Sequence, residues 1–418
     1  MLRKRSDYTK NVITLMTGTG LAQLVPILIS PILTRLYSPE DFGLIALYLS
    51  IVSIMTVLST GRYEMAIMLP DKDDDVKGIL KLIFNLTLCM SLVYFIIVLF
   101  FSNEIGMFLG SEKLAPWLYV IPLSIILTST YQSLNYLLIR TNNFKRLASN
   151  KVISSTSNSS LQLGVGYTLS TPWGLLLGHL ASLIFSIGMI VKSKCIHHFF
   201  SFRNSNSVDA AYKYKNFPRY DMPAVLINLL ANQVPLLVLA KYFGLGTLGA
   251  FSFMYKILMM PVGLISNSVL DVFKQKATKD YNLLGNCRDV YLLTLKQLII
   301  LSGPIFIIFL IFSPEIFSFV FGAKWRLAGE FAQIIAPMFF FKFVVSPLSY
   351  TLFIVGKQKQ NLKGQIVILL VSILSALVGL YHNDEFIFLM VFSALNSLVY
   401  MIYLFVSYKY SLGNLVND

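Results

Sequence analysis

Three cations, Arg62, Lys256 and Lys342, lie deep within long apolar stretches of the sequence, where a charge is costly. The anion Glu64 also lies within such a stretch, and Asp221 and Asp271 lie at the ends of two others. Charges in such segments usually mark the path of a substrate or ion. The alternative is that a long basic side chain reaches back to the interface. Because Arg and Lys bind phosphate oxygens well, three cations at three depths favour an anionic ligand.

Arg62 and Glu64 are two positions apart. On a continuous helix this spacing turns their side chains about 200° away from each other. We therefore expect each of them to need a partner on another helix, or water.

Polar residues add to these charges. Seven consecutive polar residues, Ser154 to Ser160, cover every face of a helix, so that helix cannot face lipid on all sides. One interpretation is the wall of a hydrophilic cavity, and the other is helix packing through small residues. The expected ligand-binding amides are Asn135, Asn158 and Gln233.

Composition sets the class of protein. The chain has 418 residues, of which 56% are hydrophobic and 13% charged, with a mean hydropathy of +0.69. Soluble domains are about 45–50% apolar and about 25% charged. A soluble protein is therefore excluded, and the apolar content allows about a dozen spans of about 20 residues.

Twelve apolar stretches of helical length follow one another, and none shows the alternation of a β-barrel strand. They cover residues 11–36, 43–69, 79–101, 115–140, 147–170, 172–191, 221–243, 247–272, 291–312, 328–354, 361–380 and 386–408. The predicted fold is an all-α polytopic membrane protein with about 12 transmembrane helices.

The basic residues set the orientation. Of 34 Lys and Arg residues, 26 lie in one set of alternate loops and five in the other. This asymmetry predicts that both termini are cytoplasmic, and it explains most of the net charge of +14. Nucleic-acid binding is not expected, because the basic residues are spread over seven short loops.

An internal repeat divides the chain near its middle. The motif Ala22–Leu28 (AQLVPIL) returns as Ala231–Leu237 (ANQVPLL), with a proline-to-proline offset of 209 residues. Six spans in each half give both halves the same orientation, with a substrate path expected between them. The expected bundles are residues 1–191 and 221–418.

The expected linker, residues 192–220, interleaves aromatic and basic residues. This pattern suits a segment on the anionic cytoplasmic leaflet, and a solvated loop is the alternative.

Several motifs resemble the Wzx-type O-antigen flippases, a polysaccharide export family of the MATE-like superfamily. They are Thr34–Gly43 (TRLYSPEDFG), Gly61–Pro70 (GRYEMAIMLP), Tyr214–Pro223 (YKNFPRYDMP), Trp325–Pro337 and Ser346–Ser349 (SPLS). The resemblance covers essentially the whole chain.

The resemblance implies two six-helix bundles around a central cavity. It also implies transport of an undecaprenyl-diphosphate-linked oligosaccharide from the cytoplasmic to the periplasmic leaflet of a Gram-negative inner membrane. Arg62 and Lys256 are then the candidates for binding the diphosphate, and Lys342 rests on its depth alone. Glu64, Arg219, Asp221 and Asp271 are assigned to conformational switching or ion coupling. Membrane lipids, an O-antigen polymerase and a chain-length regulator are the expected partners, with H+ or Na+ as a coupling ion.

Two other functions compete with this one. A drug or ion antiporter of the same fold would be expected to have an acidic cavity. A membrane polymerase or ligase would be expected to have a large periplasmic loop with an acid–base cluster. The predicted interior is instead richer in basic than in acidic groups, which disfavours the antiporter. The longest predicted periplasmic loop, about 313–327, has no acid–base cluster beyond Glu315, so an enzyme is not expected. No metal or cofactor is expected either, because the sequence lacks HExxH, GxGxxG and paired CxxC motifs.

Overall fold

Helices make up almost all of the part of the chain that the computed structural model describes, which is residues 2–169, 171–192, 196, 199 and 206–413. No strand occurs within those residues. This follows from the apolar composition, because a lipid-embedded backbone must satisfy its hydrogen bonds internally. The chain divides into two compact units, Met1–Leu226 and Ile227–Asp418.

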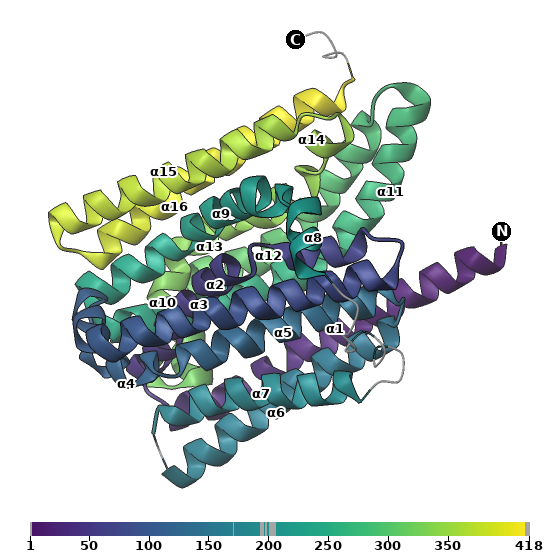
Figure 1. Ribbon diagram of the computed structural model, residues 1–418. Coiled ribbons are helices and arrows are strands. Elements are labelled where there is room, and N and C mark those ends of the chain that lie inside the picture. Colours follow the sequence, from purple (N-terminus) through teal and green to yellow (C-terminus); the bar gives the residue numbers. More distant parts are fainter. Residues whose placement is uncertain (1, 170, 193–195, 197–198, 200–205, 414–418) are drawn as a thin grey trace. The chain divides into compact units, whose positions relative to one another are not determined.

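The N-terminal unit contains eight α-helices and three shorter 3-10 or π segments among its described residues. They are α1 (Leu2–Leu36), α2 (Pro39–Thr60), η1 (Tyr63–Met68), α3 (Asp73–Phe108), η2 (Glu112–Leu114), α4 (Ala115–Leu118), α5 (Ile121–Arg140), α6 (Phe144–Leu169), α7 (Trp173–Val191), α8 (Ser207–Lys213) and η4 (Phe217–Asp221). Within this unit α6 packs against both α1 and α7, and α3 packs against α5 (Figure 1).

The C-terminal unit begins within α9. Its elements are α9 (Met222–Val238), η5 (Leu239–Phe243), α10 (Gly244–Pro261), η6 (Val262–Ser266), α11 (Asn267–Leu284), α12 (Arg288–Phe321), η7 (Ala323–Trp325), α13 (Arg326–Leu348), α14 (Thr351–Ile354), α15 (Gln358–His382) and α16 (Glu385–Ser411). Helix α13 packs against α12 and α16, and α15 lies beside α16 (Figure 1).

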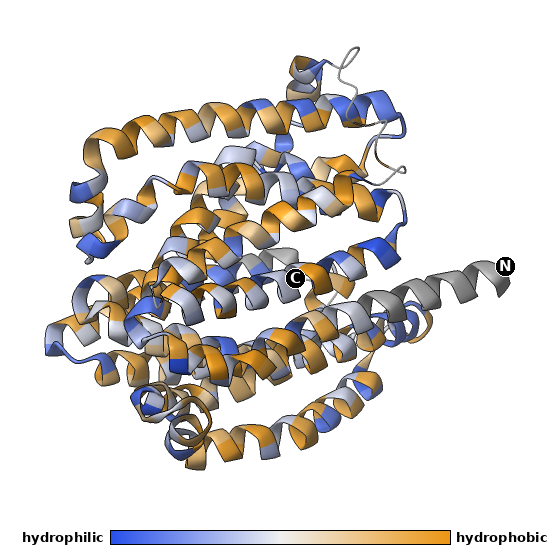
Figure 2. Ribbon diagram, turned by 90° about the horizontal axis from the view of Figure 1, so that it is seen from below, coloured by the Kyte–Doolittle hydropathy of each residue, from blue (hydrophilic) through white to orange (hydrophobic). Residues whose placement is uncertain are grey.

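Nine segments of the described chain are long and apolar enough to cross a membrane. A tenth results if Glu112–Leu118 and Ile121–Arg140, bent by 58°, form one span. One of the nine, Phe217–Leu284, has 68 residues, which is far longer than the roughly 20 residues of a single crossing. Figure 2 shows hydrophobic residues along the helices and hydrophilic residues mainly at their ends.

The prediction of a polytopic all-α protein is confirmed, because each of the twelve predicted stretches falls on a helical segment. The second stretch was predicted as one helix over 43–69, and this is wrong in its last third. Helix α2 ends at Thr60, and a separate 3-10 segment follows. The orientation of the termini stays a prediction.

The two units repeat several local features. Both α1 and α9 contain a proline of the repeated motif, Pro26 and Pro235. A short helical turn with a fully buried tryptophan, Trp117 or Trp325, precedes the fourth span of each unit. These features agree with the internal repeat seen in the sequence.

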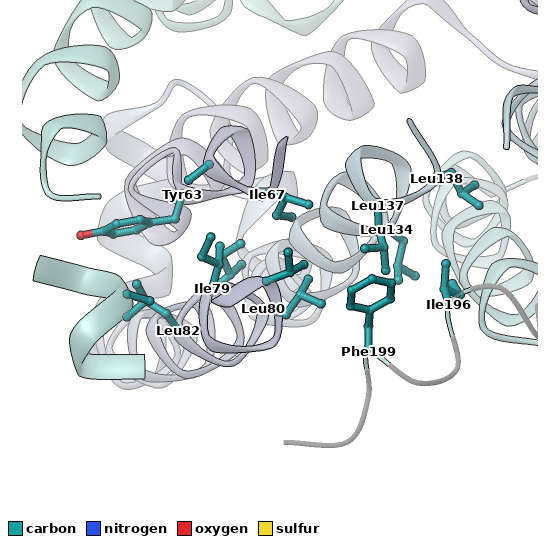
Figure 3. Close-up of a cluster of buried hydrophobic side chains, with 14 of the residues drawn as sticks. Tyr63, Ile67, Ile79, Leu80, Leu82, Leu134, Leu137, Leu138, Ile196 and Phe199 are labelled. Atoms are coloured by element: carbon teal, nitrogen blue, oxygen red, sulfur yellow. The ribbon is translucent and has the colours of Figure 1, made fainter. Parts of the chain in front are cut away.

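A cluster of buried aliphatic and aromatic side chains joins η1, α3 and α5 in the N-terminal unit (Figure 3). Phe199 and Tyr214, from the expected linker, are buried in this cluster and are 2% and 8% exposed. These two aromatic side chains therefore pack on protein rather than on a lipid surface. Residues 193–195, 197–198 and 200–205 of the linker lie outside the described residues.

Candidate functional site

The end of α2 creates the first candidate site. The helix begins with a capping box at Ser38 and ends at Gly61, whose φ of 56° is left-handed. Arg62 also has a left-handed backbone, with φ 64°. Gly is the usual residue at a helix end of this kind, whereas a left-handed conformation is unfavourable for Arg. The break turns the following residues off the axis of α2.

This break corrects the predicted geometry of Arg62 and Glu64. Arg62 Nη1 lies 3.1 Å from Glu64 Oε1, so the two side chains form an ion pair. The prediction that they face apart assumed a continuous helix. The left-handed residues Gly61 and Arg62 remove that assumption and bring both side chains to one side.

A second carboxylate reaches Arg62 from 159 residues away. The Nε of Arg62 donates a hydrogen bond of 3.0 Å to Asp221 Oδ2, at the last residue of the π segment η4. Burial acts to lower the pKa of Arg62, but the hydrogen bond to Asp221 and the charge of Glu64 outweigh it and raise the pKa. Tyr136 of α5 is close enough to interact electrostatically with all three groups.

The two carboxylates differ in their surroundings. The Glu64 side chain is 1% exposed, and its Oε2 has no hydrogen-bond partner among the described residues. The Asp221 side chain is 40% exposed. Glu64 is therefore a fixed, buried counter-ion, whereas Asp221 is accessible to solvent or to a competing ligand. We call Arg62, Glu64 and Asp221 the arginine cluster.

The C-terminal unit holds its cation differently. Lys342, in the C-terminal half of α13, donates a hydrogen bond of 2.9 Å to Tyr255 Oη. Its Nζ lies 5.2 Å from the centre of the Tyr255 ring and 5.4 Å from that of Phe339. The hydroxyl group of Tyr255 and the nearby ring of Phe339 stabilise the cation without neutralising it. No carboxylate pairs with Lys342 in the described part of the chain.

Lys342 lines a cavity of about 290 Å³ in this unit, which we call the lysine cavity. Its lining is rich in amides and hydroxyls: Asn228, Asn232, Val345, Ser346, Ser349, Asn361, Gln365, Ile368, Tyr400 and Tyr403. Asn228 Nδ2 donates to Gln365 Oε1 at 2.6 Å. None of these lining residues is acidic. The lysine cavity therefore suits an anionic ligand with many hydroxyl groups.

The other predicted charged residues lie apart from these contacts. Lys256 is exposed on α10 and has no hydrogen-bond or ion-pair partner within the described residues. Arg219 is exposed and lies over the Tyr220 ring. Asp271 is exposed on α11, 3.9 Å from Lys274. The roles of these three residues stay predictions.

The polar run of α6 contacts its neighbouring helices. Ser155 Oγ donates a 2.5 Å hydrogen bond to the Ala22 carbonyl of α1. A side chain at Gly178 of α7 would meet the backbone oxygen of Asn158 at 2.9 Å, so these two helices approach closely there. The contacts favour helix packing over a cavity wall for Ser155 and Asn158.

The predicted amides have separate places. Asn135 on α5 has a buried Oδ1 with no hydrogen-bond partner among the described residues, and the same holds for Asn158 on α6. Gln233 is half-buried on α9 and does not line the lysine cavity. Binding by these three residues stays a prediction.

Sequence reasoning missed several residues of these sites. Gln365 is a polar residue inside a predicted span and could have been found by the criterion that selected Gln233. Tyr255 and Tyr400 could not, because tyrosines are common in this sequence. Tyr136 was missed for the same reason.

Comparisons with known proteins agree with this architecture. The profile of a family described as "polysaccharide biosynthesis protein" matches residues 32–330. The succinoglycan biosynthesis transport protein ExoT of Rhizobium meliloti is 22% identical over 324 residues, which are 77% of this chain and 63% of that protein. This chain therefore matches less than two thirds of that relative's length.

Two solved structures have a similar fold. The lipid II flippase MurJ, in an inward closed conformation, aligns with a TM-score of 0.74 at 16% identity, over 95% of this chain and 87% of that one. An inward-facing multidrug resistance transporter of the MATE family aligns with a TM-score of 0.71 at 13% identity, over 95% of this chain and 93% of that one. The fold is thus that of MurJ and the MATE transporters.

Proposed function

The chain belongs to the polysaccharide biosynthesis protein family, and from this premise we propose that it is a lipid-linked oligosaccharide flippase. The proposed cargo is an undecaprenyl-diphosphate-linked O-antigen unit. It moves from the cytoplasmic to the periplasmic leaflet of a Gram-negative inner membrane, without any chemical reaction. Membership of the family and the MurJ-like fold support transport of such a molecule.

The lysine cavity is the single observation that carries the proposal. An oligosaccharide presents many hydroxyl groups, and a diphosphate presents negative charge. The cavity offers amide and hydroxyl groups for the first and one un-neutralised cation that attracts the second. A cationic drug would find no acidic partner among its lining residues, so the cavity does not favour the antiporter.

The physical problem for a flippase is that a sugar head is too polar to cross hydrocarbon unaided. Polar walls and cations inside a helical bundle replace the water that the head loses, while the prenyl tail remains in lipid. Repeated bundles of one orientation suit alternating access, in which one bundle moves against the other. The repeated local features of the two units support this mechanism.

The decisive experiment deletes the gene in its host and locates the lipid-linked repeat unit by leaflet. We expect the unit to accumulate in the cytoplasmic leaflet and surface polysaccharide to be lost. Complementation with the wild type should restore both, whereas Lys342→Gln should restore at least tenfold less export. The matched control is Lys279→Gln, which removes an exposed lysine of α11 outside the lysine cavity.

The alternatives predict different results. Accumulation of the unit in the periplasmic leaflet would mean a polymerase or ligase. An unchanged surface would favour an antiporter.

A further inference from the structure

The arginine cluster has an excess of negative charge. One guanidinium faces two carboxylates, Glu64 at 3.1 Å and Asp221 at 3.0 Å. As it stands, the cluster is therefore a poor site for an added anion. Departure of one of the two carboxylates would remove this excess negative charge and free a guanidinium N–H donor for a phosphate group.

The two carboxylates are not equally able to leave. Glu64 is buried, and it is only two residues from Arg62 on the same short segment. Moving it would require rearrangement of η1, whose Ala66 and Ile67 are fully buried. Asp221 is 40% exposed and belongs to a segment with no buried residue. A carboxylate that solvent can reach loses less on leaving an ion pair than a fully buried one, so Asp221 is the exchangeable partner.

Loss of the Arg62–Asp221 pair would affect the junction between the two units, because Asp221 lies close to that junction in the chain. It ends η4 and directly precedes α9, and the boundary between the two units follows five residues later, after Leu226. The pairing of Arg62 with Asp221 therefore tethers the junction segment to the end of α2. Breaking this pair removes one of the contacts that hold the segment, which also include the ion pair of Lys213 with Asp75.

We propose that Asp221 is an internal competitor, which occupies Arg62 when no cargo is bound and is displaced by the diphosphate of the cargo. This inference rests on the proposed function for the identity of the cargo. A diphosphate carries more charge and more acceptor oxygens than one carboxylate, and guanidinium groups bind phosphates through paired hydrogen bonds. Displacement couples cargo binding to release of the junction segment.

The test measures binding of geranyl diphosphate, a short polyprenyl diphosphate, to the full chain in phosphatidylcholine nanodiscs by titration calorimetry. Asp221→Asn removes the competing charge at nearly constant shape, and we expect affinity to rise about three- to tenfold. Asp221→Glu should stay close to wild type. In an Arg62→Gln background, Asp221→Asn should give no gain.

The matched control is Asp75→Asn, which breaks an exposed ion pair of Asp75 with Lys213 of α8 at 2.6 Å. It removes one carboxylate from another contact that holds the region before α9, and it should leave affinity unchanged. An equal gain in this control would mean that general loosening or net charge causes the effect, which overturns the proposal. Unchanged or weaker binding by Asp221→Asn, or no binding by any variant, also overturns it.

A second readout follows the junction itself. Hydrogen exchange of residues 214–224 should increase when wild type binds geranyl diphosphate, and it should already be high in Asp221→Asn without ligand. No change on binding would overturn the release step. Phosphatidylglycerol added to the nanodisc serves as a competitor of geranyl diphosphate. If it competes equally well, the ligand of Arg62 is bulk anionic lipid rather than the cargo diphosphate, which would overturn the assignment of the ligand.

The leaflet experiment separates this inference from the proposed function. If deletion traps the cargo in the cytoplasmic leaflet but Asp221→Asn binds no more tightly, flipping stands and the competitor role fails. If deletion leaves the cargo distribution unchanged, the proposed function fails whatever the binding data show.

Discussion

Two cations in this chain are stabilised by opposite means. Arg62 pairs with two carboxylates at a break between helices, whereas Lys342 lies within a helix, near two aromatic rings and a hydroxyl group. The first arrangement neutralises the cation and uses it to hold segments together for as long as both carboxylates are in place. The second leaves the charge available. The comparison shows that a buried cation is not by itself a binding site, because its partners decide whether its charge can act on a ligand.

The largest effect on stability is expected at Arg62. Arg62→Met leaves the buried Glu64 carboxylate without a counter-ion, which should lower the free energy of unfolding by about 3 kcal/mol. Thermal unfolding in detergent measures this change. The double variant Arg62→Met/Glu64→Met should recover most of the loss, because it removes both charges. A single variant as stable as wild type would show that the pair does not organise this region.

A smaller effect is expected from the backbone that forms the break. Gly61→Ala places a Cβ on a left-handed residue and should cost about 1–2 kcal/mol. The nearest atoms to that Cβ belong to the Tyr63 ring at 3.4 Å, so conformation rather than collision sets the cost. Gly188→Ala in helix α7, where a Cβ meets nothing within 4 Å, is the control and should be neutral or stabilising in the same melting assay. Equal effects at both glycines would contradict the role of the left-handed turn.

The smallest effect on stability is expected at Lys342. Lys342→Met keeps the apolar contact with the aromatic rings and leaves no carboxylate unpaired, so it should cost less than about 1 kcal/mol. The same variant should lose export, because the lysine cavity then has no cation. Thermal unfolding of the variant measures its stability, and the amount of surface polysaccharide measures its export activity. A large loss of stability would make Lys342 a structural cation like Arg62.

The sequence was sufficient to predict an all-helical membrane protein and to single out its costly charges. Apolar length places most of the helices, and the rarity of charge in apolar stretches draws attention to Arg62 and Lys342. The ion-pair partners of these charges could not be predicted in the same way. Asp221, which pairs with Arg62, is 159 residues away from it, and their contact depends on tertiary packing. One local signal was present. Gly61 is the kind of residue that ends helices, and applying that rule would have separated Glu64 from α2.

The lysine cavity shows a different limit. Asn228 and Asn232 were recognisable as polar residues in a span, but their grouping with Gln365 and Tyr400 depends on how α9, α15 and α16 meet. The polar run of α6 was visible and ambiguous, since hydroxyl groups serve packing and ligands equally. Contacts such as Ser155 with Ala22 decide between these interpretations, and no periodicity could supply them.

The polarity of α6 also has a consequence for how the protein is made. This helix of 26 residues is less apolar than the nine segments of the described chain that are long and apolar enough to cross a membrane. A translocon releases a segment into lipid according to its apolar character, so α6 is a poor candidate for insertion by itself. The hydroxyl group of Ser155 finds an acceptor on α1, which is synthesised earlier, and Asn158 is in close contact with α7, which is synthesised later. Stable insertion of α6 should therefore depend on packing against these two neighbours rather than on its own apolar character.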